Sequence, residues 1–151
     1  MELDVPLGKD ETVSSEYKFS YSLLLFFLNS NFWLTNKRLI VNAPNIFWVI
    51  PTGNDTVTYP LKQIQSVKTK TNFKFGYLFL GVVFLFIGFS SMRFGAGLLP
   101  LLLGITSIIA AFQTVIAVMS GGSIVIYSYL PWEAANAKKM INELNRLIAD
   151  I

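Results

Sequence analysis

The sequence predicts a mainly β domain with a C-terminal helix, interrupted by a pair of membrane-spanning helices. Short runs of aromatic and branched residues, separated by turn-forming residues, fill its first half. Two long stretches in its middle carry no charge, and its last segment alternates apolar and charged residues at helical spacing. The composition agrees, because 53% of the 151 residues are hydrophobic, 14% are charged and the mean hydropathy is +0.53. Ordinary soluble domains are less apolar.

The first 74 residues are expected to form short antiparallel strands. The strand-like segments are residues 17–28, 32–35, 38–42, 46–50, 56–59 and 64–69, and Asn, Ser, Pro and Gly clusters separate them. An alternative is a third membrane helix over residues 19–34. Asn29, Ser30 and Asn31 interrupt that stretch, and its uninterrupted apolar part, residues 23–28, is too short to cross a bilayer. Strands are therefore favoured there.

Residues 75–113 are predicted to form a transmembrane helical hairpin. Its first helix, residues 75–92, has 18 consecutive uncharged residues, which at about 1.5 Å per residue span about 27 Å, near the thickness of the hydrocarbon layer. The next uncharged stretch, residues 94–132, is 39 residues long and must divide. Its first part, residues 97–113, suits a second helix. From Thr114 onward, two β-branched runs flank Gly121-Gly122, which indicates a β-hairpin.

The orientation follows from the basic residues. Because the connecting turn is short, both flanks of the hairpin lie on the same side of the membrane, and the turn contains Arg93 as its one cation. The flanks carry Lys62, Lys68, Lys70, Lys74, Lys138, Lys139 and Arg146. The positive-inside rule then predicts a multi-pass protein of the cytoplasmic membrane with both termini in the cytoplasm.

Four glycines could form a packing seam between the two helices. Gly81 and Gly88 lie seven residues apart on the first helix, and Gly97 and Gly104 have the same spacing on the second. Small residues at such spacing let helices approach closely in lipid, within one chain or between two copies. Chance is the alternative explanation, because glycine is common in membrane helices.

A C-terminal helix over residues 131–149 is expected to cover the sheet. Proline at its first position is favourable. One face carries Trp132, Ala135, Met140, Leu144, Leu147, Ile148 and Ile151, and the other carries Glu133, Lys139, Asn142, Glu143, Arg146 and Asp150. The alternative is a helix lying on the bilayer. Three cations offset by three acids make that attraction weak.

The two flanking segments are predicted to be one split domain. Residues 1–74 supply strands without a covering helix, and residues 114–151 supply two strands and that helix. Together they amount to about 112 residues, the size of one domain. We expect about seven strands with a capping helix, arranged as a sandwich or partly open barrel.

Two sequence blocks carry a family resemblance. Leu34-Thr35-Asn36-Lys37-Arg38-Leu39, with the apolar residues on either side, resembles the strand, turn and strand of bacterial pleckstrin-homology-like (PH-like) and GRAM-type domains. The segment from Pro60-Leu61 through Ile64 to Val67 is similar to a second block of that family, and the closing helix fits it too. The resemblance implies a PH-like domain interrupted by the membrane hairpin, and it implies binding as the activity.

The first block also has a direct physical interpretation. Asn36 tolerates the positive φ of a tight turn, and residues two apart on either side point to one face. Pro60 suits the start or the edge of a strand. The block is therefore read mainly as a structural turn. Contact of Lys37 or Arg38 with a ligand or partner is the alternative.

Composition excludes most catalytic chemistry. The chain has no histidine and no cysteine, which removes disulfides, thiolate nucleophiles, Cys/His metal sites and His-based triads. Asp10, Glu11, Glu16 and Asp55 lie in segments expected to be exposed, without a nucleophile or a metal-ligand partner. The net charge of +3 is weak for a nucleic-acid binder. We therefore expect no enzyme activity, no cofactor, no metal and no nucleic-acid partner.

Three functions stay open at this stage. The favoured one is a membrane-anchored interaction module, a scaffold or accessory subunit that binds another membrane-associated protein or a second copy of itself. The second is a sensor of anionic lipids through Lys62, Lys68, Lys70 and Lys74, although these cations also serve to set topology. Asn29-Ser30-Asn31, taken as the first strand connection, lacks the basic pair that phosphate binding favours. The third is an accessory subunit of a transporter or channel.

Overall fold

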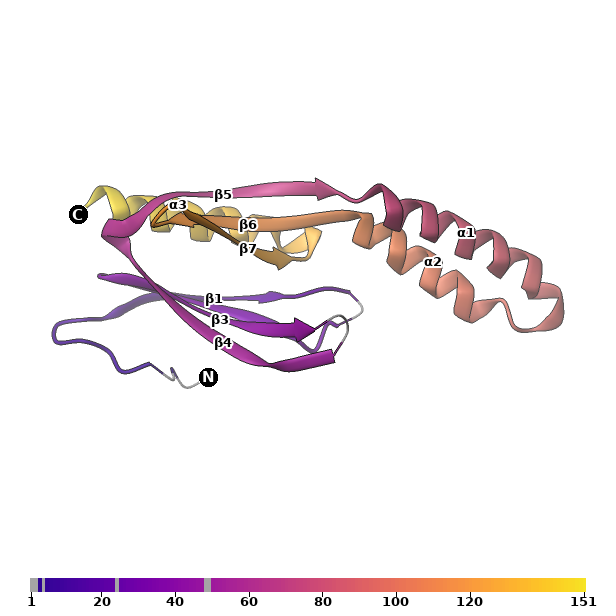
Figure 1. The fold of residues 1–151 in the computed structure, drawn as a ribbon, viewed down its shortest axis with the longest axis horizontal. Helices are drawn as coiled ribbons and strands as arrows, with labels where there is room; N and C mark the ends of the chain where they lie inside the picture. The colour runs from indigo at the N-terminus through magenta and orange to yellow at the C-terminus, as the bar shows by residue number, and fades with distance from the viewer. Residues whose placement is uncertain (1–2, 4, 24, 48–49) are drawn as a thin grey trace.

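The computed structural model describes residues 3, 5–23, 25–47 and 50–151 as two antiparallel sheets, a helical hairpin and a C-terminal helix (Figure 1). The first sheet has the order β1-β2-β3-β4, with bounds Val13–Ser20, Asn29–Thr35, Arg38–Phe47 and Ile50–Pro60. The second has the order β5-β6-β7, with bounds Ile64–Phe73, Phe112–Ser120 and Ser123–Tyr129. The helices are η1 (Leu61–Gln63), α1 (Phe75–Ser91), η2 (Met92–Phe94), α2 (Leu98–Ala111), η3 (Pro131–Glu133) and α3 (Ala134–Ala149). A mainly β fold with a C-terminal helix is thus confirmed.

Both sheets and α3 contribute to one hydrophobic core. Side chains two residues apart on a strand point to the same face, and Phe32, Leu34, Leu39 and Val41 enter the core from the first sheet in this way. The second sheet adds Ile116 and Val118, and α3 adds Ala137, Met140, Ile141 and Leu144. Burying each large apolar side chain stabilises the fold by about 1.5–3 kcal/mol. The core therefore draws on both flanking segments, as expected for one split domain.

The segments before and after the helical hairpin are joined in the second sheet. Strand β5 precedes the hairpin and β6 follows it, and they pair from Phe73↔Phe112 to Ile64↔Ser120. The N–H of Lys74 also donates to the carbonyl of Ala111 at 2.8 Å, so the ladder reaches the first residues of the hairpin. At the other end of β6, the predicted β-hairpin is confirmed. Gly121 and Gly122 have φ of 59° and 81°, which suits a two-residue turn.

Helices α1 and α2 pack antiparallel through the four predicted glycines. A Cβ added to Gly97 would lie 2.3 Å from the Gly88 carbonyl oxygen, and one added to Gly81 would lie 2.9 Å from the Gly104 oxygen. A Cβ on Gly88 would meet the Leu101 side chain at 2.6 Å. The two helices are therefore too close at these glycines to admit a side chain.

Among the described residues, one helix is long and apolar enough to cross a membrane. It runs over Phe75–Phe94, has 20 residues and a mean hydropathy of 2.0, and is 11% buried in its most apolar window. Helix α2 has 14 residues and is shorter than a usual span. It ends at Ala111, earlier than the predicted end at Gln113, because Phe112 already pairs with Phe73 in the sheet.

The predicted strand over residues 17–28 is wrong beyond Ser20. Strand β1 ends at Ser20, and a loop follows until β2 begins at Asn29. Ser30 and Asn31 are therefore buried strand residues that pair with Phe19 and Lys18, and they are not a connection. Ladder pairing outweighs the turn preference of Asn and Ser here. The alternative of a membrane helix over residues 19–34 is wrong for the same reason.

Other local expectations also differ from the structure. Asn36 does not have a positive φ, and the described non-glycine residue with one is Asp10, at 60°. Residues 43–45 and 51–55 were expected as turns but lie within the long strands β3 and β4. Part of the predicted strand 46–50 lies outside the described residues. Trp132 was expected on the covered face of the C-terminal helix, but it lies in η3 and is 62% exposed.

Candidate functional site

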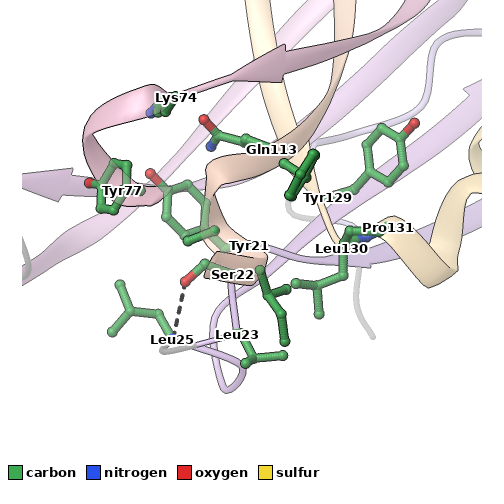
Figure 2. A pocket seen from close by; sticks show the side chains of 13 residues that line it. Tyr21, Ser22, Leu23, Leu25, Lys74, Tyr77, Gln113, Tyr129, Leu130 and Pro131 are labelled. Atoms are coloured by element: carbon green, nitrogen blue, oxygen red, sulfur yellow. Dashed lines mark hydrogen bonds between the residues drawn. The ribbon is translucent and has the colours of Figure 1, made fainter. Parts of the chain in front are cut away.

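A pocket of about 200 Å³ lies where the β domain meets the helical hairpin. Five segments surround it: the β1–β2 loop, the first turn of α1, the end of α2, the start of β6 and the β7–η3 connection (Figure 2). It is smaller than most sites for small molecules. Its lining residues are Tyr21, Ser22, Leu23, Leu25, Lys74, Tyr77, Ile109, Ala110, Phe112, Gln113, Tyr129, Leu130 and Pro131.

The β1–β2 loop holds its shape through its own hydrogen bonds. The N–H of Tyr21 donates to the Leu28 carbonyl at 2.9 Å, and the N–H of Leu28 donates to the Leu25 carbonyl at 3.0 Å. The Ser22 hydroxyl accepts the N–H of Leu25 at 3.1 Å (Figure 2). Beyond Leu25, Phe26 and Phe27 are 70% and 58% exposed. The loop thus presents two aromatic rings on a hydrogen-bonded turn.

The polar side chains around the pocket are largely engaged in local contacts. The Lys74 ammonium lies 5.5 Å from the centre of the Tyr77 ring, a favourable cation–π distance. Gln113 donates from Nε2 to the Ser128 hydroxyl at 2.7 Å, and the Thr114 hydroxyl donates to the Tyr129 carbonyl at 2.6 Å. Burial raises the pKa of Tyr129, so its hydroxyl stays neutral at physiological pH.

Glu133 fixes the opposite wall of the pocket to the end of β1. Its carboxylate accepts the N–H of Ser20 at 3.0 Å and the N–H of Leu130 at 3.1 Å. These bonds hold the β7–η3 connection beside the point where the β1–β2 loop begins. Trp132 follows the pocket residue Pro131 in the chain and is exposed.

The structure does not gather the four predicted lipid-contacting lysines into one cluster. Lys74 begins α1, and Lys68 and Lys70 are exposed on one side of β5. Lys62 lies in η1, beyond the far end of β5. Because a strand of ten residues is about 33 Å long, Lys62 is far from the helical hairpin.

Lys37 and Arg38 bind the N-terminal segment of their own chain. The Arg38 Nε lies 2.7 Å from a Glu11 carboxylate oxygen, and its terminal nitrogen donates to the Pro6 carbonyl at 2.8 Å. The Lys37 ammonium donates to the Lys9 carbonyl. Asn36 donates to the Asp10 carbonyl and accepts the N–H of Thr12. The turn therefore organises residues 6–12, which supports its structural interpretation.

Sequence reasoning missed three carboxylates with defined roles. Glu11 was expected to lie in an exposed segment, but it is 8% exposed and bound by Arg38. Glu133 joins β1 to η3, and Glu143 accepts hydrogen bonds from Ser15 and Tyr17 of β1. Their side-chain partners and the Ser20 N–H lie 24 to 128 residues away in the chain, so no local pattern indicates these long-range contacts.

Comparisons with protein families, with curated proteins and with solved structures find no significant match to this chain.

Proposed function

We propose that this chain is a non-enzymatic, membrane-anchored interaction module. Helices α1 and α2 anchor it in the cytoplasmic membrane, and the split β domain stands on the cytoplasmic side, where it binds another membrane-associated protein. The observation that carries the proposal is the β5–β6 ladder. It pairs up to Phe73 and Phe112 and continues through the bond between Lys74 and Ala111. Both helices therefore leave the domain at one point and project together from it (Figure 1).

The exposed outer surface of the helical hairpin supports the proposal that the hairpin lies in the lipid bilayer. Large apolar side chains are exposed along α1, including Phe75, Phe79, Phe86 and Phe89, and Leu98, Leu99, Leu102 and Ile105 are exposed on α2. Water contact with such a surface is unfavourable by about 25 cal/mol per Å² of apolar area. Monomeric soluble proteins rarely expose apolar patches of this kind. Lys74 at the base and Arg93 at the tip are the flanking cations of the hairpin.

The strand arrangement supports the PH-like interpretation of the domain. Four antiparallel strands, then three, then a C-terminal helix that closes the core are consistent with that resemblance. Such a domain offers rigid exposed surfaces to a partner. The carboxylates Glu11, Glu133 and Glu143 all hold structural contacts, which supports a binding role rather than a catalytic one.

Anionic-lipid sensing receives less support than protein binding. The candidate lysines extend along β5 away from the helical hairpin instead of converging on one headgroup. A role as accessory subunit of a transporter or channel is one form of the proposed module, because the hairpin could pack against a larger membrane protein through its exposed residues.

Cysteine labelling tests the anchoring, because the chain has no natural cysteine. Ser14→Cys, Asn145→Cys and Phe94→Cys would be treated in intact cells with a membrane-impermeant maleimide. We expect labelling at position 94 from outside, and at positions 14 and 145 only after lysis. Finding positions 14 and 145 on opposite sides, or position 94 on their side, would contradict the topology.

In-cell crosslinking followed by affinity purification and mass spectrometry tests the interaction. We expect one membrane-associated protein, or a second copy of the chain, to be recovered in stoichiometric amount. A protein that stays uncrosslinked and monomeric but binds anionic vesicles selectively would favour the lipid-sensor alternative instead.

A further inference from the structure

The second helix of the hairpin is short for the layer that the hairpin is proposed to cross. Helices α1 and η2 together run over 20 residues, about 30 Å, but α2 has 14 residues, which correspond to about 21 Å against about 30 Å of hydrocarbon. The apolar surface continues onto the strands, since the rings of Phe73 and Phe112 are 5.2 Å apart and about half exposed. The short α2 draws the β domain against the bilayer, so the lipid boundary falls near the last residues of β5 and the first residues of β6.

The β1–β2 loop lies at that level. Leu23 and Leu25 line the same pocket as Lys74 and Tyr77 of α1 and Ile109 of α2. The loop therefore lies on one side of a small pocket, and the residues where the hairpin leaves the domain line the same pocket (Figure 2). In Figure 1 it lies at the end of the β domain from which α1 and α2 project.

The chemistry of the loop suits lipid. Residues 21–28 carry no charge, and the exposed rings are those of Phe26 and Phe27. The N–H groups of Tyr21, Leu25 and Leu28 already have partners within the loop, so immersion leaves these donors satisfied. Trp132, which follows the pocket residue Pro131 in the chain, is exposed and belongs to a residue type enriched at membrane interfaces.

We propose that the β1–β2 loop inserts Phe26 and Phe27 into the cytoplasmic leaflet of the bilayer beside the hairpin, with Trp132 at the interface. This inference rests on the proposed membrane anchoring. The insertion is a second point of membrane contact, which fixes how the β domain is turned about the hairpin and therefore which of its faces a partner meets. The ligand is the apolar part of the bilayer, because the loop has no cation to select a headgroup.

Lipid-borne quenching tests the insertion on the full chain. Phe26→Cys, Phe27→Cys, Phe86→Cys and Ser123→Cys would each carry an environment-sensitive fluorophore in vesicles of phosphatidylcholine alone. Position 86 lies in α1, and position 123 lies at the end of β6 and β7 farthest from the hairpin. We expect lipids with a spin probe near the headgroup to quench positions 26 and 27 several-fold more than position 123. Aqueous iodide should show the reverse order.

The label at position 86 separates the two proposals. Lipid quenching at position 86, with positions 26 and 27 as open to iodide as position 123, would overturn the insertion and leave the anchoring intact. If iodide also quenched the label at position 86, both the insertion of the loop and the anchoring of the hairpin would be overturned. Positions 26 and 27 are labelled in separate proteins. If one label disturbs the loop, the quenching measured at the other position reveals the disturbance.

Discussion

Glu11 joins the N-terminal segment to the turn between β2 and β3. Burial opposes ionisation of its carboxyl, but hydrogen bonds from Arg38, the Gly8 N–H and the Thr35 hydroxyl outweigh that effect and lower its pKa from 4.5 to about 2. A carboxylate held in this way is more stable ionised in the folded chain than in the unfolded chain. The contacts join residues 8 and 11 to the turn at residues 35–38.

Replacing Glu11 by Gln is expected to lower the free energy of unfolding by about 1–3 kcal/mol, because Arg38 loses its ionic partner. In the natural chain this stabilisation is complete above pH 4.5 and is lost as the pH falls toward about 2. Denaturant unfolding of the full chain in detergent micelles at pH 7 and at pH 3 measures both effects. The difference in the free energy of unfolding between the natural chain and the Glu11→Gln variant should be smaller at pH 3 than at pH 7. Glu16→Gln, on an exposed residue of β1, is the control, and an equal loss there would contradict the assignment.

Tyr17 and Glu143 form a second titrating pair. Burial, and then the hydrogen bond to Glu143 at 2.6 Å, raise the pKa of Tyr17 from 10 to about 12. The hydrogen bonds from Ser15 and Tyr17 lower the pKa of Glu143. Stabilisation by Tyr17 is therefore complete below pH 10 and is lost as the pH rises toward 12.

Glu143→Gln should move the pKa of Tyr17 back toward 10, because it removes the charge that opposes tyrosinate formation. Ultraviolet titration of the tyrosines checks this, with Tyr17→Phe identifying which step belongs to Tyr17. An unchanged titration in the Glu143 variant would show that burial alone controls Tyr17.

Among the elements, the helical hairpin depends on close backbone contact. Gly97→Ala would place a methyl group 2.3 Å from the Gly88 carbonyl oxygen and 2.8 Å from the Met92 nitrogen, and neither backbone atom can move aside easily. We expect a loss of about 1–3 kcal/mol, measured as a lower unfolding midpoint in micelles. Gly76→Ala is the matched control, because nothing lies within 4 Å of its added Cβ. Equal destabilisation by both would show that the contact at Gly97 is unimportant.

Elements with a local cause were predictable from the sequence. The β6–β7 turn follows from two adjacent glycines, α1 from an uncharged stretch, and α3 from its apolar spacing. The β1–β2 boundary was not predictable, since only the pairing of Ser30 and Asn31 with β1 shows that β2 begins at Asn29. The candidate pocket was missed for a similar reason. It is built from five segments whose proximity arises in the folded chain.

At the scale of the whole molecule, the β5–β6 ladder at the base of the hairpin predicts that the β domain folds without the helical hairpin. Phe73 pairs with Phe112, and the Lys74 N–H bonds the Ala111 carbonyl, so a two-residue Asn-Gly turn between positions 74 and 111 closes the same ladder. The core residues of both sheets and α3 remain in this variant. We expect a water-soluble protein with a β-rich circular dichroism spectrum and cooperative thermal unfolding.

A second variant, in which the pairing register of β5 and β6 is shifted, is the control for the first. If Lys74 is also removed, β5 and β6 are joined with a one-residue slip, and the slip turns the side chains of one strand to the opposite face. Val67 and Ile116 then cannot both enter the core, and we expect an aggregated or unfolded protein. Folding of both variants would show that the turn does not control β5–β6 pairing. Failure of both would show that the hairpin is part of the folding unit, and the β domain would then need its membrane anchor to form.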